Sequence, residues 1–423
     1  MCMFAAFKQT IKTMKKRFTL FLTIITLMTT SLRAQSDLDM NSLLSQINAD
    51  SLLQTVMDLQ NFGSRFALRE GGNIEVAEYL VERLHRYDVS AVIDSFHHDG
   101  YFWLGGYYDQ WFYNVKGILP SANPVDDSIV IVGAHLDAIS YDHSNYSLQA
   151  LAPGADDNAS GVAVMIELAR ICHANHLQFH RDIHFMAYDG EELGLFGSYY
   201  DAEARLIAEE NVKLMINNDM VSFQPDNDWR LTLHWYSNAM EPLHRAAELC
   251  AQYTDIEPYI PDVADNTDAA YSDSYAYYVK GFPAVFAIEY TFSTSYHTDH
   301  DVADSNNYAY HADVARYNMA LLADYALWSN GTGVEEHETT TSLCLSPNPV
   351  NDRAVLLYQN EEGAIASISV YDMTGRLVLR QDEQGDVSGT HRTELNLSHL
   401  PSGFYICRLQ TPSRVETVKF VRE

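Results

Sequence analysis

Apolar residues between positions 35 and 330 alternate between runs of strand length and stretches with helical spacing. Strand-length apolar or β-branched runs predict strands at Ser128–Ala134, Asp182–Tyr188, Val212–Asn217, Trp229–Trp235 and Ala284–Glu289. Helical spacing predicts helices at Ile74–Tyr87, Gly161–Ala174, Glu241–Tyr253 and Ala312–Trp328. Strands that alternate with helices indicate an α/β fold, in which helices cover both faces of a central sheet.

The segment Tyr101–Tyr113 departs from this pattern because it is crowded with aromatic residues. Gly105 and Gly106 lie inside it and favour a turn. We expect a β-hairpin packed on the edge of the domain. The alternative is a lip over a substrate cleft.

The pattern changes again after residue 330. Residues 331–342 belong to a stretch, Ser329–Ser342, that is rich in Gly, Thr and Glu without apolar periodicity, which indicates a linker. Short alternating segments then predict strands at Ala354–Tyr358, Ala366–Asp372, Leu377–Arg380, Arg392–Leu397, Phe404–Gln410 and Val415–Val421. We expect residues 343–423 to form a small all-β, immunoglobulin-like sandwich.

The N-terminus has the features of an export signal. Lys15, Lys16 and Arg17 precede an apolar run, Phe18–Met28, and small residues lead to Ala34. The run is too short to span a membrane comfortably. We expect a signal peptide over residues 1–34, with Met14 as an alternative start, and no transmembrane anchor in the mature chain.

Composition narrows the possible functions. The chain has 423 residues, 47% of them hydrophobic, which supports a globular core in more than one domain. Its net charge of −30 argues against nucleic acid and against an anionic membrane surface as partners. The five Cys are too widely spaced for a metal motif, and we expect Cys172 and Cys250 to be buried thiols rather than a bridge.

Five short polar segments place a His or a carboxylate at or just after the end of a strand-like run. They are His135–Asp137, Gly154–Gly161, Asp189–Gly194, Asn217–Met220 and Tyr296–Asp299. Two His and three carboxylates are the ligands that a pair of zinc ions would take. One carboxylate beside a ligand would remain as the base that hydrolysis needs.

His135 and Asp137 form the first of these groups. His135 follows an apolar run, so it is expected at the carboxyl end of a strand, where α/β sheets gather their ligands. Asp137 can hold the imidazole ring and fix its tautomer. A single His at a strand end is usually only a packed polar residue, but the other segments favour a metal ligand here.

Two of the segments contain adjacent acids. One of Asp156 and Asp157 could cap the following helix, but a cap needs only one acid, so the other is expected to bridge two metals. Glu191 and Glu192 would repel each other unless a cation neutralised one of them. The simplest division gives Glu192 to a metal and leaves Glu191 to accept a proton from water.

The remaining ligands expected are Asp219 and His297. Asp219 follows the apolar run that begins at Val212, and His297 lies in a loop rich in Tyr, Thr and Asp. His300 is the alternative to His297.

Together these residues resemble the co-catalytic dizinc aminopeptidases, a family with bacterial leucyl aminopeptidases and, more distantly, glutamate carboxypeptidase and glutaminyl cyclase. The resemblance covers residues 35–330 and rests on His135–Asp137, Pro153–Gly161, Glu191–Ser198, Asn218–Met220 and His297-Thr298. It implies the zinc-peptidase fold, a mixed central sheet sandwiched by helices. Asn61–Phe66 is also similar to the N-terminal part of that family.

The same resemblance implies roles for individual residues. Asp157 would bridge two zinc ions, and Glu191 would be the general base. The other ligands would be Glu192 and His297 on one zinc, and His135 and Asp219 on the second. The sequence departs from the family at Tyr271–Ser274, where relatives often have Ser-Asp-His. Any substrate contact made by that His is in doubt here.

Residues 343–423 resemble a different family, the C-terminal sorting domains of the type IX secretion system. The matching segments are Ser346–Val350, Val370–Arg376, Leu397–Tyr405 and Lys419–Val421. The alternative is a carbohydrate-binding or adhesive sandwich.

We therefore expect a secreted or cell-surface dizinc aminopeptidase that crosses the periplasm and uses the type IX machinery as its export partner. Its substrates would be peptides with a free N-terminus, as the resemblance implies. One alternative is a glutaminyl cyclase on the same scaffold, with one zinc and no hydrolytic water. Another is a catalytically inactive surface-binding relative.

Overall fold

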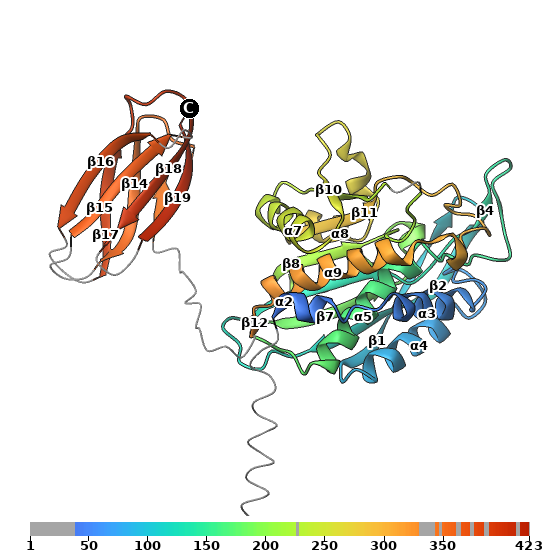
Figure 1. Ribbon diagram of the computed structural model, residues 1–423. Helices are drawn as coiled ribbons and strands as arrows, with labels where there is room; N and C mark the ends of the chain where they lie inside the picture. The colour runs from blue at the N-terminus through green and yellow to red at the C-terminus, as the bar shows by residue number, and fades with distance from the viewer. Residues whose placement is uncertain are drawn as a thin grey trace, which may run out of the picture. The chain divides into compact units, whose positions relative to one another are not determined.

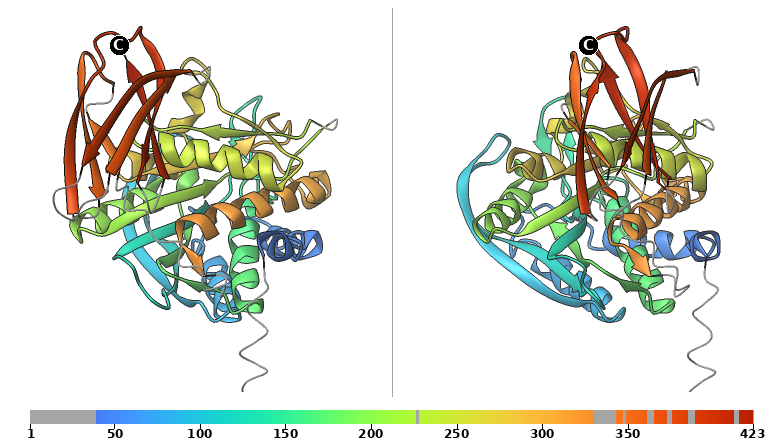
Figure 2. Two further views of the ribbon diagram at one scale, coloured as in Figure 1. Left: turned by 60° about the vertical axis from the view of Figure 1, so that its left-hand side comes forward. Right: turned by 90° about the vertical axis from the view of Figure 1, so that its left-hand side faces the viewer.

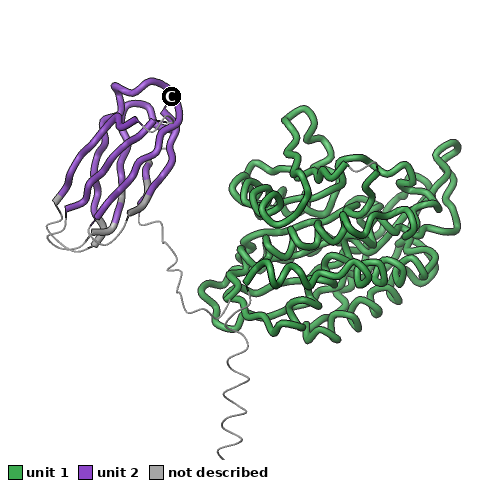
Figure 3. Tube along the Cα trace, viewed as in Figure 1, with its two compact units in different colours: residues 1–332 green, residues 333–423 purple. Residues whose placement is uncertain are grey.

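The computed structural model describes residues 39–225, 228–329, 343–346, 349–360, 365–372, 376–384, 389–411 and 415–422. The chain divides into two units, residues 1–332 and 333–423 (Figure 3). The expected signal peptide over residues 1–34 and the expected linker over 331–342 lie outside the described residues. Within the described part, no helix combines the length and the apolar character that a membrane crossing requires.

The first unit is built on one eight-stranded sheet with the order β1-β2-β7-β3-β8-β11-β9-β10 (Figure 1). Strands β7, β3, β8 and β11 are parallel neighbours, whereas β2 pairs antiparallel with β7 and β9 pairs antiparallel with β11. The sheet is therefore mixed, as predicted. Its strands are β1 Ser90–Phe102, β2 Gly106–Leu119, β3 Ser128–His135, β7 Asp182–Tyr188, β8 Asn211–Asn218, β9 Arg230–His234, β10 Glu257–Tyr259 and β11 Ala284–Glu289.

The central strands bury both of their faces. In β3, Val130 and Val132 belong to one apolar core, and Ile129 and Ile131 belong to another. This division follows from the strand geometry, which sends successive side chains to opposite faces of a sheet. Because both faces are covered, β3 is apolar from Ile129 to Ala134 instead of alternating with polar residues.

Helices supply the two covering layers (Figure 2). The larger core includes residues of α2 Met40–Leu44, α3 Ala49–Gln60, α4 Ile74–His85, α5 Ala159–Ala174, α7 Met240–Tyr253 and α9 Tyr308–Tyr325. The smaller core includes residues of α6 Phe196–Ile207 and α8 Ser274–Val279. Cys172 and Cys250 are buried free thiols, as expected.

Helix α9 differs at both ends from the bounds that the sequence predicted. Helix α9 begins earlier than predicted because the Asn307 side chain accepts hydrogen bonds from the first turn. At its other end, Trp328 belongs to a short strand rather than to the helix. The short strands of this unit are β4 Tyr141–Asp142, β5 Ser147–Leu148, β6 Gln178–Phe179 and β12 Trp328–Ser329.

The aromatic segment forms the hairpin of β1 and β2, with β1 at the edge of the sheet, which confirms the favoured interpretation. The hairpin is longer than predicted and spans residues 90–119. It is the long curved ribbon at the edge of the sheet in Figure 2.

The second unit is all-β, as predicted. Its two sheets share one core, which includes Leu356, Val370, Leu395 and Phe420. Strands β13 Cys344–Ser346, β14 Arg353–Asn360 and β17 Gly389–Asn396 form one sheet, and β16 Leu377–Gln384, β15 Ile365–Asp372, β18 Gly403–Gln410 and β19 Val415–Arg422 form the other. Two sheets around one core make this unit a small sandwich.

Candidate metal centre

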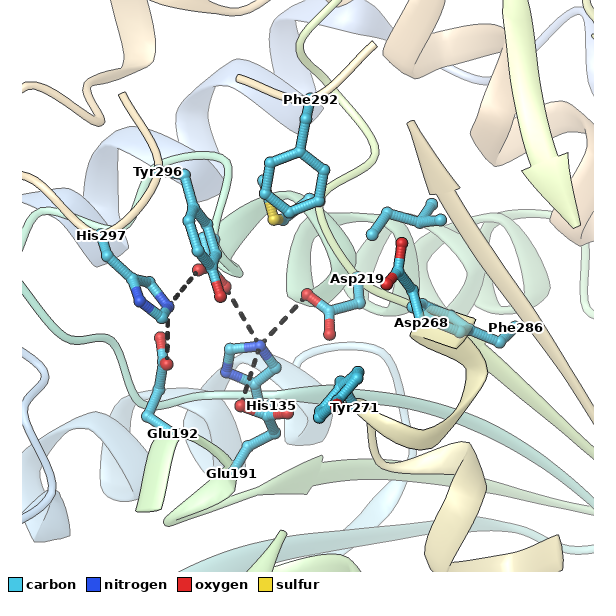
Figure 4. A pocket seen from close by; sticks show the side chains of 13 residues that line it. His135, Glu191, Glu192, Asp219, Asp268, Tyr271, Phe286, Phe292, Tyr296 and His297 are labelled. Atoms are coloured by element: carbon cyan, nitrogen blue, oxygen red, sulfur yellow. Dashed lines mark hydrogen bonds and ion pairs between the residues drawn. The ribbon is translucent and has the colours of Figure 1, made fainter. Parts of the chain in front are cut away.

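The five side chains expected to bind metal converge at the carboxyl ends of neighbouring strands (Figure 4). His135 is the last residue of β3, and Asp219 directly follows β8. Glu192 lies in η1 Glu191–Leu193, the short 3-10 helix after β7. Asp157 stands just before α5, and His297 lies in the loop after β11. The topology thus brings together residues that are far apart in the sequence.

The Asp157 carboxylate stands between the two imidazoles. Its Oδ1 is 3.2 Å from His135 Nε2, and its Oδ2 is 3.2 Å from His297 Nε2. His135 Nε2 is also 3.2 Å from Asp219 Oδ1, and His297 Nε2 is 2.8 Å from Glu192 Oε2. Two groups of three ligand atoms therefore share Asp157, and the atoms of each group lie within 4.8 Å of one another.

These separations suit zinc. Tetrahedral zinc with bonds of about 2.1 Å holds neighbouring ligand atoms about 3.4 Å apart. The donor atoms around Asp157 lie at 2.8–3.2 Å. Glu192 Oε1 and His297 Nδ1 are buried and make no hydrogen bond within the described residues. The donor set thus fits two zinc ions that share one carboxylate.

The charges of these groups also favour a cation. Burial alone would lower the pKa of His297, but the Glu192 and Asp157 carboxylates raise that pKa to about 11. Burial raises the pKa of Glu192 to about 7. The carboxylates therefore stabilise a positive charge on the neighbouring imidazole. A metal ion can supply that positive charge in place of the proton.

Asp156 and His300, the alternatives to Asp157 and His297 as metal ligands, lie outside the ligand cluster. Asp156 Oδ1 accepts hydrogen bonds from Ser222, from its backbone N–H at 2.9 Å and its hydroxyl at 2.8 Å, away from the ligand cluster. The His300 side chain is 86% exposed, and its Nδ1 lies 3.6 Å from Asp299 Oδ1. Asp157 and His297, and neither Asp156 nor His300, line the pocket.

Asp137 supports two parts of the site at once. Its carboxylate accepts hydrogen bonds from the backbone N–H groups of Glu191, at 3.1 Å, and Glu192, at 3.3 Å. His135 Nδ1 lies 3.2 Å from the Asp137 carbonyl oxygen and 3.5 Å from its carboxylate. A single buried acid therefore positions both a ligand ring and the segment that carries the paired glutamates.

Glu191 lies beside the cluster, with its Oε2 at 3.9 Å from His135 Nε2. Burial raises the pKa of its carboxyl well above the ordinary value, and the nearby Glu192 adds to that rise. Gly190 turns the chain into this segment with a φ of 75°. A Cβ at that position would lie 2.9 Å from the Phe112 ring, so glycine is required there.

Sequence reasoning missed two charged residues that hold the ligand loops. The buried Arg65 guanidinium donates to the carbonyl oxygens of Leu136 at 2.8 Å and Gly154 at 2.7 Å, next to ligand-bearing segments. The Asp301 carboxylate accepts from the backbone N–H groups of Asp156 and Asp157. Asp301 follows His297 by four positions, and Arg65 lies in the segment Asn61–Phe66; these positions were the available signals.

A pocket of about 150 Å³ contains the cluster, and its lining combines the expected ligands with apolar side chains. The apolar part of the lining includes Met220, Phe286, Ile288 and Phe292, and Figure 4 labels Phe286 and Phe292. Ser274, where relatives often have His, does not line this pocket; it is buried, 2.9 Å from the Tyr236 hydroxyl.

Another residue of the same segment reaches the cluster. Ser272 donates a hydrogen bond of 2.7 Å to Asp219 Oδ2. The segment that departs from the family pattern therefore still contacts an expected ligand.

A helix-covered mixed sheet with this donor set at its carboxyl edge defines a zinc-dependent hydrolase of the zinc-peptidase fold. Residues 114–322 match peptidase family M28, and residues 345–423 match the secretion system C-terminal sorting domain. The first unit belongs to peptidase family M28, and the second is a type IX sorting domain that directs export.

Individual proteins agree with this assignment. A probable leucine aminopeptidase of Arthroderma otae is 26% identical over 300 residues, which cover 68% of this chain and 75% of the relative. The zinc aminopeptidase of Bacillus subtilis superposes with a TM-score of 0.54 at 15% identity, covering 66% of this chain and 95% of that one. The glutaminyl cyclase of Bacteroides thetaiotaomicron superposes with a TM-score of 0.52 at 20% sequence identity. The superposition covers 65% of this chain and 97% of the cyclase. These two structures share the fold.

Proposed function

We propose that this protein is an exported aminopeptidase with two zinc ions per chain, which removes residues from the free N-terminus of peptides. One observation carries the proposal. The two oxygens of Asp157 face two separate His-containing ligand groups, and Glu191 belongs to neither of the two groups that share Asp157. The ligands would be those expected, with His297 and Glu192 on one zinc and His135 and Asp219 on the other.

The chain's own residues supply proton transfer and positioning. When bound, the zinc ions would polarise a scissile carbonyl and make a water molecule more acidic. The Glu191 carboxylate would accept a proton from that water and pass it to the departing amine. Asp137 would position Glu191 by accepting its backbone N–H bond. The turn at Gly190 and this hydrogen bond hold the backbone of Glu191, so its carboxylate would stay close to the reacting atoms.

The pocket and the surrounding acids support the choice of substrate. A free α-ammonium group would be attracted by the carboxylates of Asp219 and Glu191. The first side chain of the peptide would enter the apolar part of the pocket, which Phe286, Ile288 and Phe292 line. The name of the Arthroderma otae relative, a probable leucine aminopeptidase, agrees with an apolar first residue.

We also propose the route of export and the boundaries that it requires. The signal peptide over residues 1–34 would direct the chain to the periplasm. The domain at 343–423, joined by the linker at 331–342, would then engage the type IX machinery. The peptidase at residues 35–330 would act outside the cell or on its surface.

Three peptides distinguish this function from its alternatives. The purified protein should release leucine from Leu-Gly-Gly-Gly and leave the N-acetylated form of that peptide intact. A glutaminyl cyclase would instead release ammonia from Gln-Gly-Gly-Gly without cutting a peptide bond. A non-catalytic protein would change none of them. Mass spectrometry of the products separates these outcomes, and cleavage of the acetylated peptide would contradict an aminopeptidase.

A further inference from the structure

An aromatic surface continues from the candidate metal centre toward the tip of the β1–β2 hairpin. The ring of the expected ligand His297 lies 5.6 Å from the ring of Tyr141 in β4. Tyr141 in turn lies 5.6 Å from Trp103, at the hairpin tip, and 6.2 Å from Tyr146. Trp103 and Tyr146 are 6.0 Å apart. We call Tyr141, Trp103 and Tyr146 the aromatic shelf.

The shelf is open to solvent although it is made of large rings. Trp103 is 63% exposed and Tyr146 is 59% exposed. Large aromatic side chains that remain exposed together, next to a binding pocket, mark a surface that contacts another molecule. Among the described residues, their ring contacts are with each other, with Tyr141 and, for Trp103, with the adjacent Phe102.

The segment that carries the shelf is tied to the ligand loop. The Tyr141 backbone N–H donates to the His297 carbonyl oxygen at 3.0 Å. His143 Nε2 lies 3.1 Å from the Tyr296 carbonyl oxygen. Strand β4 pairs with β5, which closes a short hairpin around Tyr146. Tyr141 and Tyr146 are therefore held next to the candidate metal centre, and Trp103 reaches them from the hairpin tip through ring contacts.

The shelf and the Phe286 part of the pocket lie on opposite sides of the centre. Tyr141 contacts His297, and Figure 4 shows His297 on one side of His135 and both Asp219 and Phe286 on the other. A peptide whose first side chain fills the pocket would place its scissile bond at the ligands. The rest of its chain would then continue toward the shelf.

We propose that the aromatic shelf binds the part of a peptide substrate that follows the scissile bond, with a preference for aromatic side chains. The proposal rests on the proposed aminopeptidase function. Two ring-to-ring steps of 5.6 Å each separate His297 from Trp103. An extended peptide advances about 3.3 Å per residue, so the shelf would reach roughly the second and third residues after the cut.

Matched substrates test the proposal. We compare kcat/KM for Leu-Gly-Phe-Gly, Leu-Gly-Gly-Gly and leucine p-nitroanilide, which has no peptide beyond the first residue. The full-length protein should prefer the Phe peptide to the Gly peptide by about 3- to 10-fold, the usual gain from one aromatic contact. The W103A/Y146A double variant should lose this preference and keep its rate on leucine p-nitroanilide.

A variant of another exposed tryptophan on the hairpin serves as the control. Trp111 lies on the same hairpin, is 52% exposed and has its ring contact with His97 instead of the shelf. W111A should keep the preference for the Phe peptide. An equal rate on both peptides in the unmodified protein, or an unchanged preference in W103A/Y146A, would overturn the proposal. Loss of all hydrolysis in the unmodified protein would instead reject the aminopeptidase function.

Discussion

Asp156 and Asp157 are adjacent and chemically identical, yet they face different surroundings. Asp301 binds the backbone N–H groups of both residues. The Asp156 side chain accepts a hydrogen bond from Ser222, whereas the Asp157 side chain lies between the imidazoles of His135 and His297. The residue types were therefore predictable, whereas the choice between the two acids rested on family resemblance.

The first prediction concerns this choice. Asp157→Ala should lose bound zinc together with activity, because it removes the carboxylate that both ligand groups share. Asp156→Asn should keep zinc, since the amide oxygen can still accept the Ser222 bonds. Elemental analysis of the purified variants measures the difference. Two zinc ions retained by Asp157→Ala would move the bridge to another residue, with Asp156 tested next.

The second prediction concerns the base. Glu191→Gln should keep zinc and lower kcat by about 10²–10⁴-fold, the usual cost of losing a general base. The amide has nearly the same shape as the acid but cannot accept the proton. Glu209→Gln, an exposed acid beyond the end of α6, serves as the control and should keep normal activity. Near-normal turnover in Glu191→Gln would assign the base elsewhere.

At the scale of elements, the sequence predicted the bounds of buried strands better than those of short helices. The central strands β7 and β11 match their expected bounds because continuous apolar runs of strand length mark them clearly. Short elements were missed, since α2, with 5 residues, and α8, with 6, are too brief to show helical periodicity. Tertiary packing, rather than local sequence, stabilises such short helices.

Two buried histidines, one in β7 and one in α9, determine part of the pH dependence of the protein's stability. His184 in β7 and His311 in α9 are buried. Burial lowers the pKa of His184 to about 3 and that of His311 to about 4, below the ordinary value of 6.5. Protonation therefore favours the unfolded chain. The stability that these residues contribute is complete above about pH 6.5 and is lost as the pH falls toward the lower values.

The third prediction uses this linkage. Between about pH 7 and about pH 5, His311→Gln should lose about 2 kcal/mol less unfolding free energy than the unmodified protein. The comparison is the change in unfolding free energy between the two pH values, which does not depend on how stable the variant is at pH 7. Urea unfolding at each pH measures it. An identical change in both proteins would mean that His311 is protonated in the folded state.

At the scale of the whole molecule, the chain divides into an α/β unit and an all-β unit, the two fold classes that the sequence predicted. Each unit has its own apolar core. Average composition predicted neither the order of strands nor which residues would meet, because both depend on contacts between distant segments. The family resemblance supplied the ligand set, whereas the aromatic shelf required the positions of Tyr141 and Trp103 in three dimensions.

The fourth prediction follows from these separate cores. A chain of residues 35–332, produced in the cytoplasm, should fold, bind zinc and hydrolyse leucine p-nitroanilide at close to the full-length rate. In the native host, the chain truncated after residue 332 should remain in the periplasm, because the sorting domain is gone. Normal export of that chain would reject the sorting role. A folded but inactive truncation would mean that the sandwich contributes to the active site.

The zinc content of the active, full-length protein tests the central claim most directly. The protein is freed of loosely bound metal, and zinc and protein are then measured in the same sample by elemental analysis and amino-acid analysis. We predict two zinc ions per chain, because two ligand groups share Asp157. A fully active enzyme with one zinc ion per chain, or none, would contradict the account.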